Sequence, residues 1–243
     1  RSTLFPYTTL FRSPYRAGVV SLVLFVVLVL NVGDLLRILR LRVGAWLLGA
    51  IDATVAYELV VARVTDLKPT RDFCLRNIGP GLSPLKKMRR WHAHNSKIFW
   101  ILVPTQPEDG VAIDYIQSIH GYFGIIPINS AACKALDEEQ LDGISFTTDH
   151  ICAEAEAPAA YYIAGVAAEH KIARIKILRK LKQHLERLVS VQAQLFYTRP
   201  ISRSGLDLVE SFRFTRVDKQ PEIALNEIHQ KVISRSDLHG LRA

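Results

Sequence analysis

Cysteine and methionine are scarce in this sequence, and each shortage excludes something. Three cysteines, Cys74, Cys133 and Cys152, occur among 243 residues. Their odd number and wide spacing argue against a disulfide scaffold and favour a reducing compartment, and they show no paired zinc pattern. Met88 is the only methionine. The open reading frame is therefore expected to begin upstream of the given sequence, and the native start is undefined.

Acidic residues and lysine are absent from the first thirteen residues, RSTLFPYTTLFRS. No small-residue cleavage site follows, as a signal peptide requires, and the apolar pairs recur six residues apart, which fits neither helix nor strand. The stretch resembles a translated sequencing adapter and is expected to contribute nothing to the fold. Without Arg1 and Arg12, 29 basic residues stand against 23 acidic ones, a net charge of +6. That excess predicts an anionic partner: a phosphorylated cofactor, nucleic acid or an anionic lipid surface.

Long uncharged runs are also rare, and the clearest covers the seventeen residues 17–33. This length is at the short end of what spans a hydrocarbon core of about 30 Å, and it predicts one transmembrane or hydrophobic helix. A signal segment and upstream DNA that was never coding remain alternatives. Arg16 precedes the run, whereas Arg37, Arg40 and Arg42 follow it. The positive-inside rule therefore places the larger, C-terminal part in the cytoplasm.

The rest of the chain alternates between strand and helix patterns. Asp52 and Glu58 interrupt a second apolar stretch at 43–64, which predicts a juxtamembrane helix followed by a strand. β-branched and aromatic runs bounded by turn residues predict strands, and apolar residues at steps of three and four predict helices. The expected strands are 57–64, 98–104, 116–128, 159–168, 194–201 and 213–217. The expected helices are 70–77, 84–94, 130–143, 169–190, 202–212 and, in a polar basic tail, 221–233.

This order of elements resembles that of the GNAT acyltransferase superfamily. Two stretches carry the resemblance. YYIAGVAAEHKIARIK, at 161–176, is similar to the family's fourth strand and cofactor loop, and YTRPISRSGLDLVESFRF, at 197–214, is similar to its late strand and short helix. The resemblance implies an α+β fold with a mixed, mostly antiparallel sheet flanked by helices. The predicted divisions are an artefact at 1–13, a hydrophobic segment at 14–53, a GNAT-like domain at 54–217 and a tail at 218–243.

The resemblance implies that acetyl-CoA or another acyl-CoA binds where the long helix begins. Unpaired N–H groups and the positive end of the helix dipole bind a pyrophosphate in such a loop. The family motif, Gln/Arg-x-x-Gly-x-Gly/Ala, would begin at Lys171, and its glycine positions hold Arg174 and Lys176. We expect these three side chains to contact phosphates as charges.

The strand before that loop is expected to pair, through the backbone of Val166, Ala167 and Ala168, with the pantetheine arm of the donor. Two other interpretations of the basic helix remain open. Between residues 169 and 190 it carries seven lysines or arginines against two glutamates. It could be a solvated basic face, or it could contact anionic lipid.

The second stretch departs from the family where a proton donor is expected. Val209 stands where the family often carries its acidic tyrosine, and Arg213 stands at its closing glycine. Tyr197 and Tyr162 are the alternative donors, unless each is a packed strand aromatic. His150 precedes the cofactor strand, where family members often deprotonate the amine, and its intrinsic pKa suits a general base. The alternative for His150 is an ordinary surface residue.

The sequence predicts no metal site, because His92 and His94 are two residues apart on an expected helix and so do not share a face. Nucleic-acid binding is not expected, since no known module and no basic-aromatic interleaving is present. The predicted function is transfer of an acyl group from acyl-CoA to an unidentified amine, in a cytoplasmic domain tethered to the membrane by one span. The alternative is a catalytically inactive GNAT-fold sensor or binding module at the membrane.

Overall fold

The computed structural model describes residues 56–105, 119–218 and 226–239. Contacts divide the chain into two units, Arg1–Thr54 and Val55–Ala243, and every described residue lies in the second. The predicted artefact at 1–13 and hydrophobic segment at 14–53 lie outside the described residues, so the membrane tether stays a prediction. Within the three described ranges, no helix combines the length and apolar character needed to cross a bilayer.

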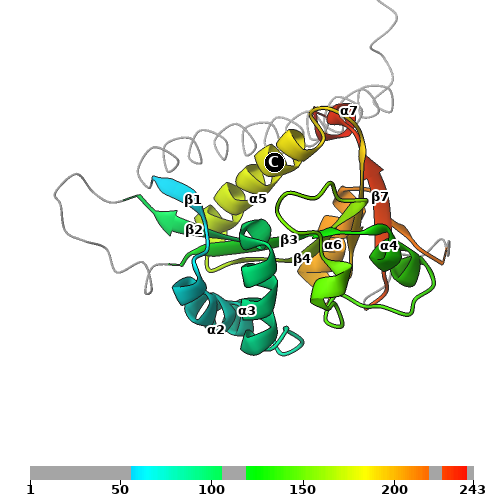
Figure 1. Cartoon of the computed structure of the whole chain (residues 1–243). Helices are drawn as coiled ribbons and strands as arrows, with labels where there is room; N and C mark the ends of the chain where they lie inside the picture. Colours follow the sequence, from blue (N-terminus) through cyan, green and yellow to red (C-terminus); the bar gives the residue numbers. More distant parts are fainter. Residues whose placement is uncertain (1–55, 106–118, 219–225, 240–243) are drawn as a thin grey trace, which may run out of the picture. The chain divides into compact units, whose positions relative to one another are not determined.

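A mixed sheet organises the described residues, and its seven strands follow the order β1-β2-β3-β4-β5-β7-β6 (Figure 1). Neighbouring strands are antiparallel except β4 and β5, which are parallel. This confirms the predicted mixed, mostly antiparallel sheet. The strands are β1 Tyr57–Val61, β2 Phe99–Pro104, β3 Gly121–Ile128, β4 Ala160–Ala168, β5 Gln194–Thr198, β6 Thr215–Arg216 and β7 His229–Ile233.

Helices cover both faces of the sheet, and the alternation of strand side chains shows which helix lies where. Phe99 and Ile101 of β2 pack into one core cluster with residues of α2, α3 and α4, whereas Trp100 and Leu102 join a second cluster with α5, α6 and α7. We call these sides the α2 face and the α5 face. The helices are α2 Leu67–Asn77, α3 Leu85–His94, α4 Ser130–Asp137, α5 Lys171–Leu188, α6 Arg203–Ser211 and α7 Arg235–His239.

Two expected helices differ from the structure. The first, α4, ends at Asp137 and not at Gly143, and its N-cap is Asn129, whose side chain accepts the Ala132 N–H at 3.0 Å. Glu139, two residues past the helix, adopts a left-handed backbone with φ of 55°. Because non-glycine residues take that conformation as single residues and not as helices, the helix cannot continue there.

The second difference lies in the tail, where the helix expected at 221–233 is wrong over 229–233. That segment, HQKVI, forms strand β7, which pairs antiparallel with β5 along its whole length and carries β6 on its other edge. The sheet therefore continues past the boundary expected at residue 217. The polar composition of this segment gives no strand pattern in the sequence. It forms a strand because it pairs with β5.

Asp66 is buried at the end of a 3-10 turn, Val64–Asp66, that leads into α2, and its carboxylate closes that turn back onto Arg63. Its Oδ2 accepts hydrogen bonds from the Arg63 backbone N–H at 2.9 Å and from Arg63 Nε at 3.1 Å. Burial raises the pKa of Asp66, but the hydrogen bonds from Arg63 more than offset this, and the net pKa lies below its ordinary value. The folded state thus favours the ionised carboxylate.

Stability is expected to depend on the ionisation of Asp66 at low pH. A carboxyl group whose pKa is lower in the folded state contributes stability above its unfolded pKa, about 3.9, and loses it as the pH falls through the folded value. Urea unfolding between pH 7 and pH 3 should show a decline that is shallower in Asp66→Asn. The difference should not exceed about 1.4 kcal/mol per pH unit, the limit for one proton. Identical slopes would contradict this role.

Candidate functional site

The candidate site lies where the two parallel strands separate. β4 and β5 are paired from Tyr161 opposite Phe196 to Ile163 opposite Thr198, and the Thr198 hydroxyl donates to the Ile163 carbonyl at 3.1 Å. Beyond this point β4 continues to Ala168, whereas the chain after Thr198 leaves the sheet and enters α6. Within the described ranges, the last five residues of β4 therefore pair with β3 on one edge and with no strand on the other.

A β-bulge marks the same place on β4. Gly165 is opposite Gly124 of β3, and Ile163 is opposite Ile125, so Ala164 is the extra residue. A bulge bends its strand and locally increases its twist. The bend therefore coincides with the end of the β4–β5 pairing, which favours separation of the two strands.

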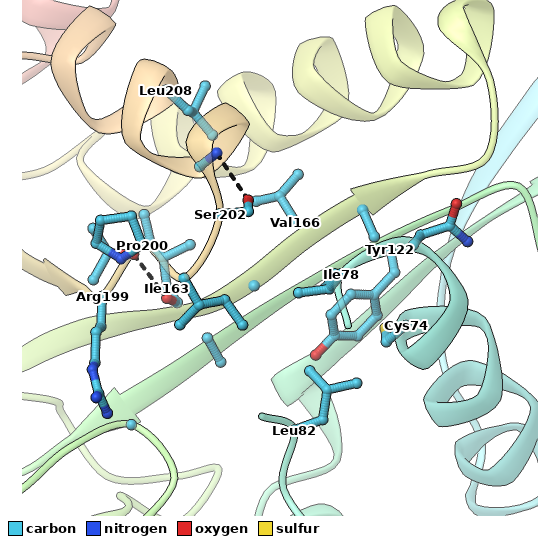
Figure 2. Close-up of a pocket in the computed structure, with 18 of the residues that line it drawn as sticks. Cys74, Ile78, Leu82, Tyr122, Ile163, Val166, Arg199, Pro200, Ser202 and Leu208 are labelled. Carbon is cyan, nitrogen blue, oxygen red and sulfur yellow. Dashed lines mark hydrogen bonds between the residues drawn. The ribbon is translucent and has the colours of Figure 1, made fainter. Parts of the chain in front are cut away.

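A cavity of about 260 Å³ fills this opening, and its lining comes from both faces of the sheet (Figure 2). The walls between the faces are the separated strand segments 163–168 and 198–202. From the α2 face the lining includes Cys74, Ile78, Leu82, Met88, Trp91 and Tyr122. From the α5 face it includes Ile177, Leu178, Leu181, Leu185, Val209 and Phe214. The cavity is therefore a mainly apolar passage that connects the two faces.

Three arginines contribute to the lining, and two of them are held by the protein itself. Arg199 donates through Nη1 to Asp142 Oδ2 at 2.8 Å and through Nε to the Asn226 carbonyl at 2.8 Å. Arg71 donates through Nε to the Ser83 carbonyl at 3.1 Å. Arg174, in the first turn of α5, is exposed and makes no side-chain ion pair within the described residues. It is the cationic group best placed to meet an anionic ligand.

Two tyrosine rings lie on the α2-face side of the cavity, and their hydroxyl groups differ. Tyr162 Oη accepts the N–H of Gly143, while burial raises its pKa. Tyr122 is also buried, and burial followed by the nearby Cys74 raises its pKa well above the ordinary value. Its hydroxyl has no hydrogen-bond partner among residues 56–105, 119–218 and 226–239, and Figure 2 shows it pointing between Ile78 and Leu82.

The Tyr122 ring lies over the two glycines that face each other across β3 and β4. A Cβ atom added at Gly124 would come within 2.5 Å of the Tyr122 hydroxyl oxygen, and one added at Gly165 would be 3.7 Å from the ring. The absence of a side chain at Gly124 therefore makes room for the ring and sets where its hydroxyl lies. Sequence reasoning missed this triplet, because the stretch 116–128 was expected only to form a strand.

Of the residues predicted to bind the cofactor, four meet at the cavity. Val166, Ala167, Ala168 and Arg174 all line it. Lys171 is exposed, and Lys176 is partly buried further along α5; neither lines the cavity.

The start of α5 is closed by a residue that the sequence analysis did not single out. His170 is the N-cap, and its Nδ1 accepts the Ala173 N–H at 3.3 Å. Its Nε2 lies 3.3 Å from the Tyr57 hydroxyl and 3.3 Å from His120 Nδ1. One of the N–H groups that would otherwise face an anion is therefore already bonded. A polar residue before an amphipathic run is an N-cap signal, but histidine is not among the usual N-cap residues.

The two predicted catalytic residues lie away from the cavity lining. His150 Nδ1 accepts the Thr147 backbone N–H at 3.1 Å. Tyr197 is fully buried, and its hydroxyl donates to Asp137 Oδ1 at 2.8 Å. Burial and the Asp137 carboxylate both raise the Tyr197 pKa. The structure does not bring either side chain together with Val166 and Arg174, and each has a structural partner.

The structure explains how the fold accommodates Val209 and Arg213, the two residues of 197–214 that differ from the family pattern. Val209, where the family often carries a tyrosine, is buried and lines the cavity. Arg213 adopts a left-handed backbone with φ of 57°, the conformation that favours glycine. The Phe214 N–H then bonds the Val209 carbonyl at 3.1 Å and closes α6. The backbone turn is thus retained although the glycine is absent.

The fold and the cavity define a mixed α/β protein whose candidate site lies between two separated parallel strands. Neither the protein-family models nor the curated proteins give a match to the sequence. The solved structures that are similar to this chain include three described as follows. A mosquito arylalkylamine N-acetyltransferase like 5b is 11% identical over 73% of this chain and 100% of its own, with a TM-score of 0.43. The GNAT-like decarboxylase GphF in complex with isobutyryl-CoA is 11% identical over 63% of this chain and 70% of its own, with a TM-score of 0.40. The GNAT family N-acetyltransferase YhbS from Escherichia coli in complex with CoA is 13% identical over 77% of this chain and 87% of its own, with a TM-score of 0.40.

Proposed function

We propose that this domain transfers an acyl group from acyl-CoA to an amine. The observation that carries the proposal is the cavity between β4 and β5, which is lined by residues from both faces of the sheet and lies at a β-bulge. A donor and an acceptor can enter such a passage from opposite sides and meet within it. The arrangement agrees with the GNAT resemblance of the two sequence stretches.

The separated edge of β4 supports binding of the donor. A pantetheine arm is extended and carries two amide groups, so it can add to a strand edge as a peptide does. Val166, Ala167 and Ala168 offer such an edge, because β5 no longer pairs there. Arg174 and the positive end of the α5 dipole lie beyond that edge and favour the phosphates of the same ligand.

The apolar walls support the transfer step. An amine must lose its proton before it attacks a thioester carbonyl, and a cavity with few polar groups favours the neutral amine over the ammonium ion. The attack forms a C–N bond, the C–S bond then breaks, and the proton lost by nitrogen balances the one gained by sulfur. Positioning two reactants in one passage provides the main rate advantage.

A binding module without catalysis is the second candidate, and the start of α5 is the observation that favours it. His170 occupies one helix N–H, and side chains stand at Arg174 and Lys176, where the family motif has small residues. Both features restrict close approach of a pyrophosphate to the backbone.

Calorimetric titration of the full chain with coenzyme A tests the shared part of both candidates. We expect a saturable heat that weakens as salt is added, because part of the affinity comes from phosphate charge. No heat at millimolar coenzyme A would contradict both. Release of free thiol from acetyl-CoA, dependent on an added primary amine, then separates the enzyme from the binding module.

A further inference from the structure

We propose that Tyr122 is a catalytic residue, whose hydroxyl carries the proton from the attacking amine to the departing sulfur. The inference rests on the proposed acyl transfer. It starts from the position of the hydroxyl, which lies in the cavity above Gly124 and beside the bulge at Ala164, where the passage crosses the sheet. No residue that the sequence predicted as catalytic reaches this place.

The Tyr122 hydroxyl is placed where a bound ligand can become its hydrogen-bond partner. Buried polar groups are normally hydrogen-bonded, and an unpaired one costs stability. Tyr162 and Tyr197 follow that rule, since each hydroxyl has a partner. The Tyr122 hydroxyl has none in the part of the chain that the structure describes; it is not enclosed as His184 Nδ1 and His229 Nε2 are, but faces a cavity that can hold a substrate. A bound substrate would supply the missing partner.

The proton balance of the step is complete without another reactant. The neutral amine nitrogen attacks the thioester carbon and forms the C–N bond. As the C–S bond breaks, the Tyr122 O–H gives its proton to sulfur, and the phenol oxygen takes one from the nitrogen, which becomes an amide. Burial keeps the phenol protonated before the reaction, since its pKa is raised. Because one proton arrives as the other leaves, no free phenolate has to be stable in the apolar cavity.

The test compares Tyr122→Phe with Tyr161→Phe in the full chain. Thiol release is measured with acetyl-CoA and three primary amines: an arylalkylamine, a polyamine and an amino acid. For Tyr122→Phe we expect kcat to fall about 100-fold, the lower range for general acid–base catalysis, with the KM for acetyl-CoA and coenzyme A affinity within about threefold. Tyr161 is a matched control, because it lies on the α5 face against Phe196 and does not line the cavity.

Two further readouts separate a catalytic role from a structural one. Because the hydroxyl faces the cavity and no described residue depends on it, the melting temperature of Tyr122→Phe should equal that of the wild type. The wild type should react more slowly in D₂O, and the variant should lose that isotope effect. Gly124→Ala keeps the hydroxyl but displaces it, and it should also lower kcat at least tenfold.

The outcomes distinguish this inference from the function on which it rests. Absence of coenzyme A binding and of thiol release in the wild type would overturn both. An active wild type with an equally active Tyr122→Phe would overturn the inference alone. A fall in kcat that comes with a lower melting temperature and an unchanged isotope effect would also overturn it.

Discussion

Replacing Gly165 with phenylalanine is expected to weaken coenzyme A binding by at least 100-fold, which corresponds to about 2.7 kcal/mol. A Cβ at this position would be 3.5 Å from Ile78 Cδ1 and 3.7 Å from the Tyr122 ring, both ordinary contacts. Atoms beyond the Cβ would have to enter the cavity between those two side chains. The ring would therefore occupy the passage where the pantetheine arm and the thioester are proposed to lie.

Three substitutions of increasing size at Gly165 test this prediction. Gly165→Ala adds an atom that the site accepts without a clash and should reduce affinity least, with Gly165→Leu intermediate. Calorimetric titration of each full-length variant with coenzyme A measures the series, and thermal unfolding shows that each variant is folded. Wild-type affinity in a folded Gly165→Phe protein would place the donor elsewhere.

Replacing Gly143 with alanine is expected to lower the free energy of unfolding by about 1 to 3 kcal/mol, the usual range for overpacking a buried site. A Cβ atom there would overlap the hydroxyl and ring carbons of Tyr162. Tyr162 is only 3% exposed and has the Phe146 ring against it at 5.0 Å, so it has little room to move. The Gly143 N–H that now bonds the Tyr162 hydroxyl would also be displaced.

Urea unfolding monitored by circular dichroism measures this loss. Gly205→Ala is the matched control, because Gly205 lies in α6 with its nearest neighbour at 3.3 Å, and alanine is the better helix former there. It should be neutral or slightly stabilising. If both variants unfold at the same urea concentration as the wild type, the contact between Gly143 and Tyr162 does not constrain this loop.

The predicted secondary structure was most accurate where the apolar pattern repeated. The strand expected at 159–168 and the helix expected at 169–190 correspond to β4 and α5. Their signals are local, since a buried strand and an amphipathic helix show their period within one segment. Element ends were less accurate, because caps such as Asn129 and His170 depend on individual side-chain hydrogen bonds.

Four of the residues predicted to bind the cofactor lie together at the cavity, and their role in binding stays a prediction. Val166, Ala167, Ala168 and Arg174 were placed together by resemblance, and all four line the cavity. Tyr122 was missed because it is one aromatic residue in a buried strand. What distinguishes it is Gly124 beneath its hydroxyl and Gly165 opposite, and the second of these comes from another strand.

The sequence alone determined most of the succession of strands and helices, the basic character of α5 and the strand that leads into it, because each is encoded in neighbouring residues. The tertiary structure alone decided that HQKVI is a strand, that β4 and β5 separate after Ile163, and that the Tyr122 phenol lies in the opening. The physical reason is that these features consist of contacts between distant segments. A strand's hydrogen bonds come from its neighbours, and a cavity is defined by the residues on all of its sides.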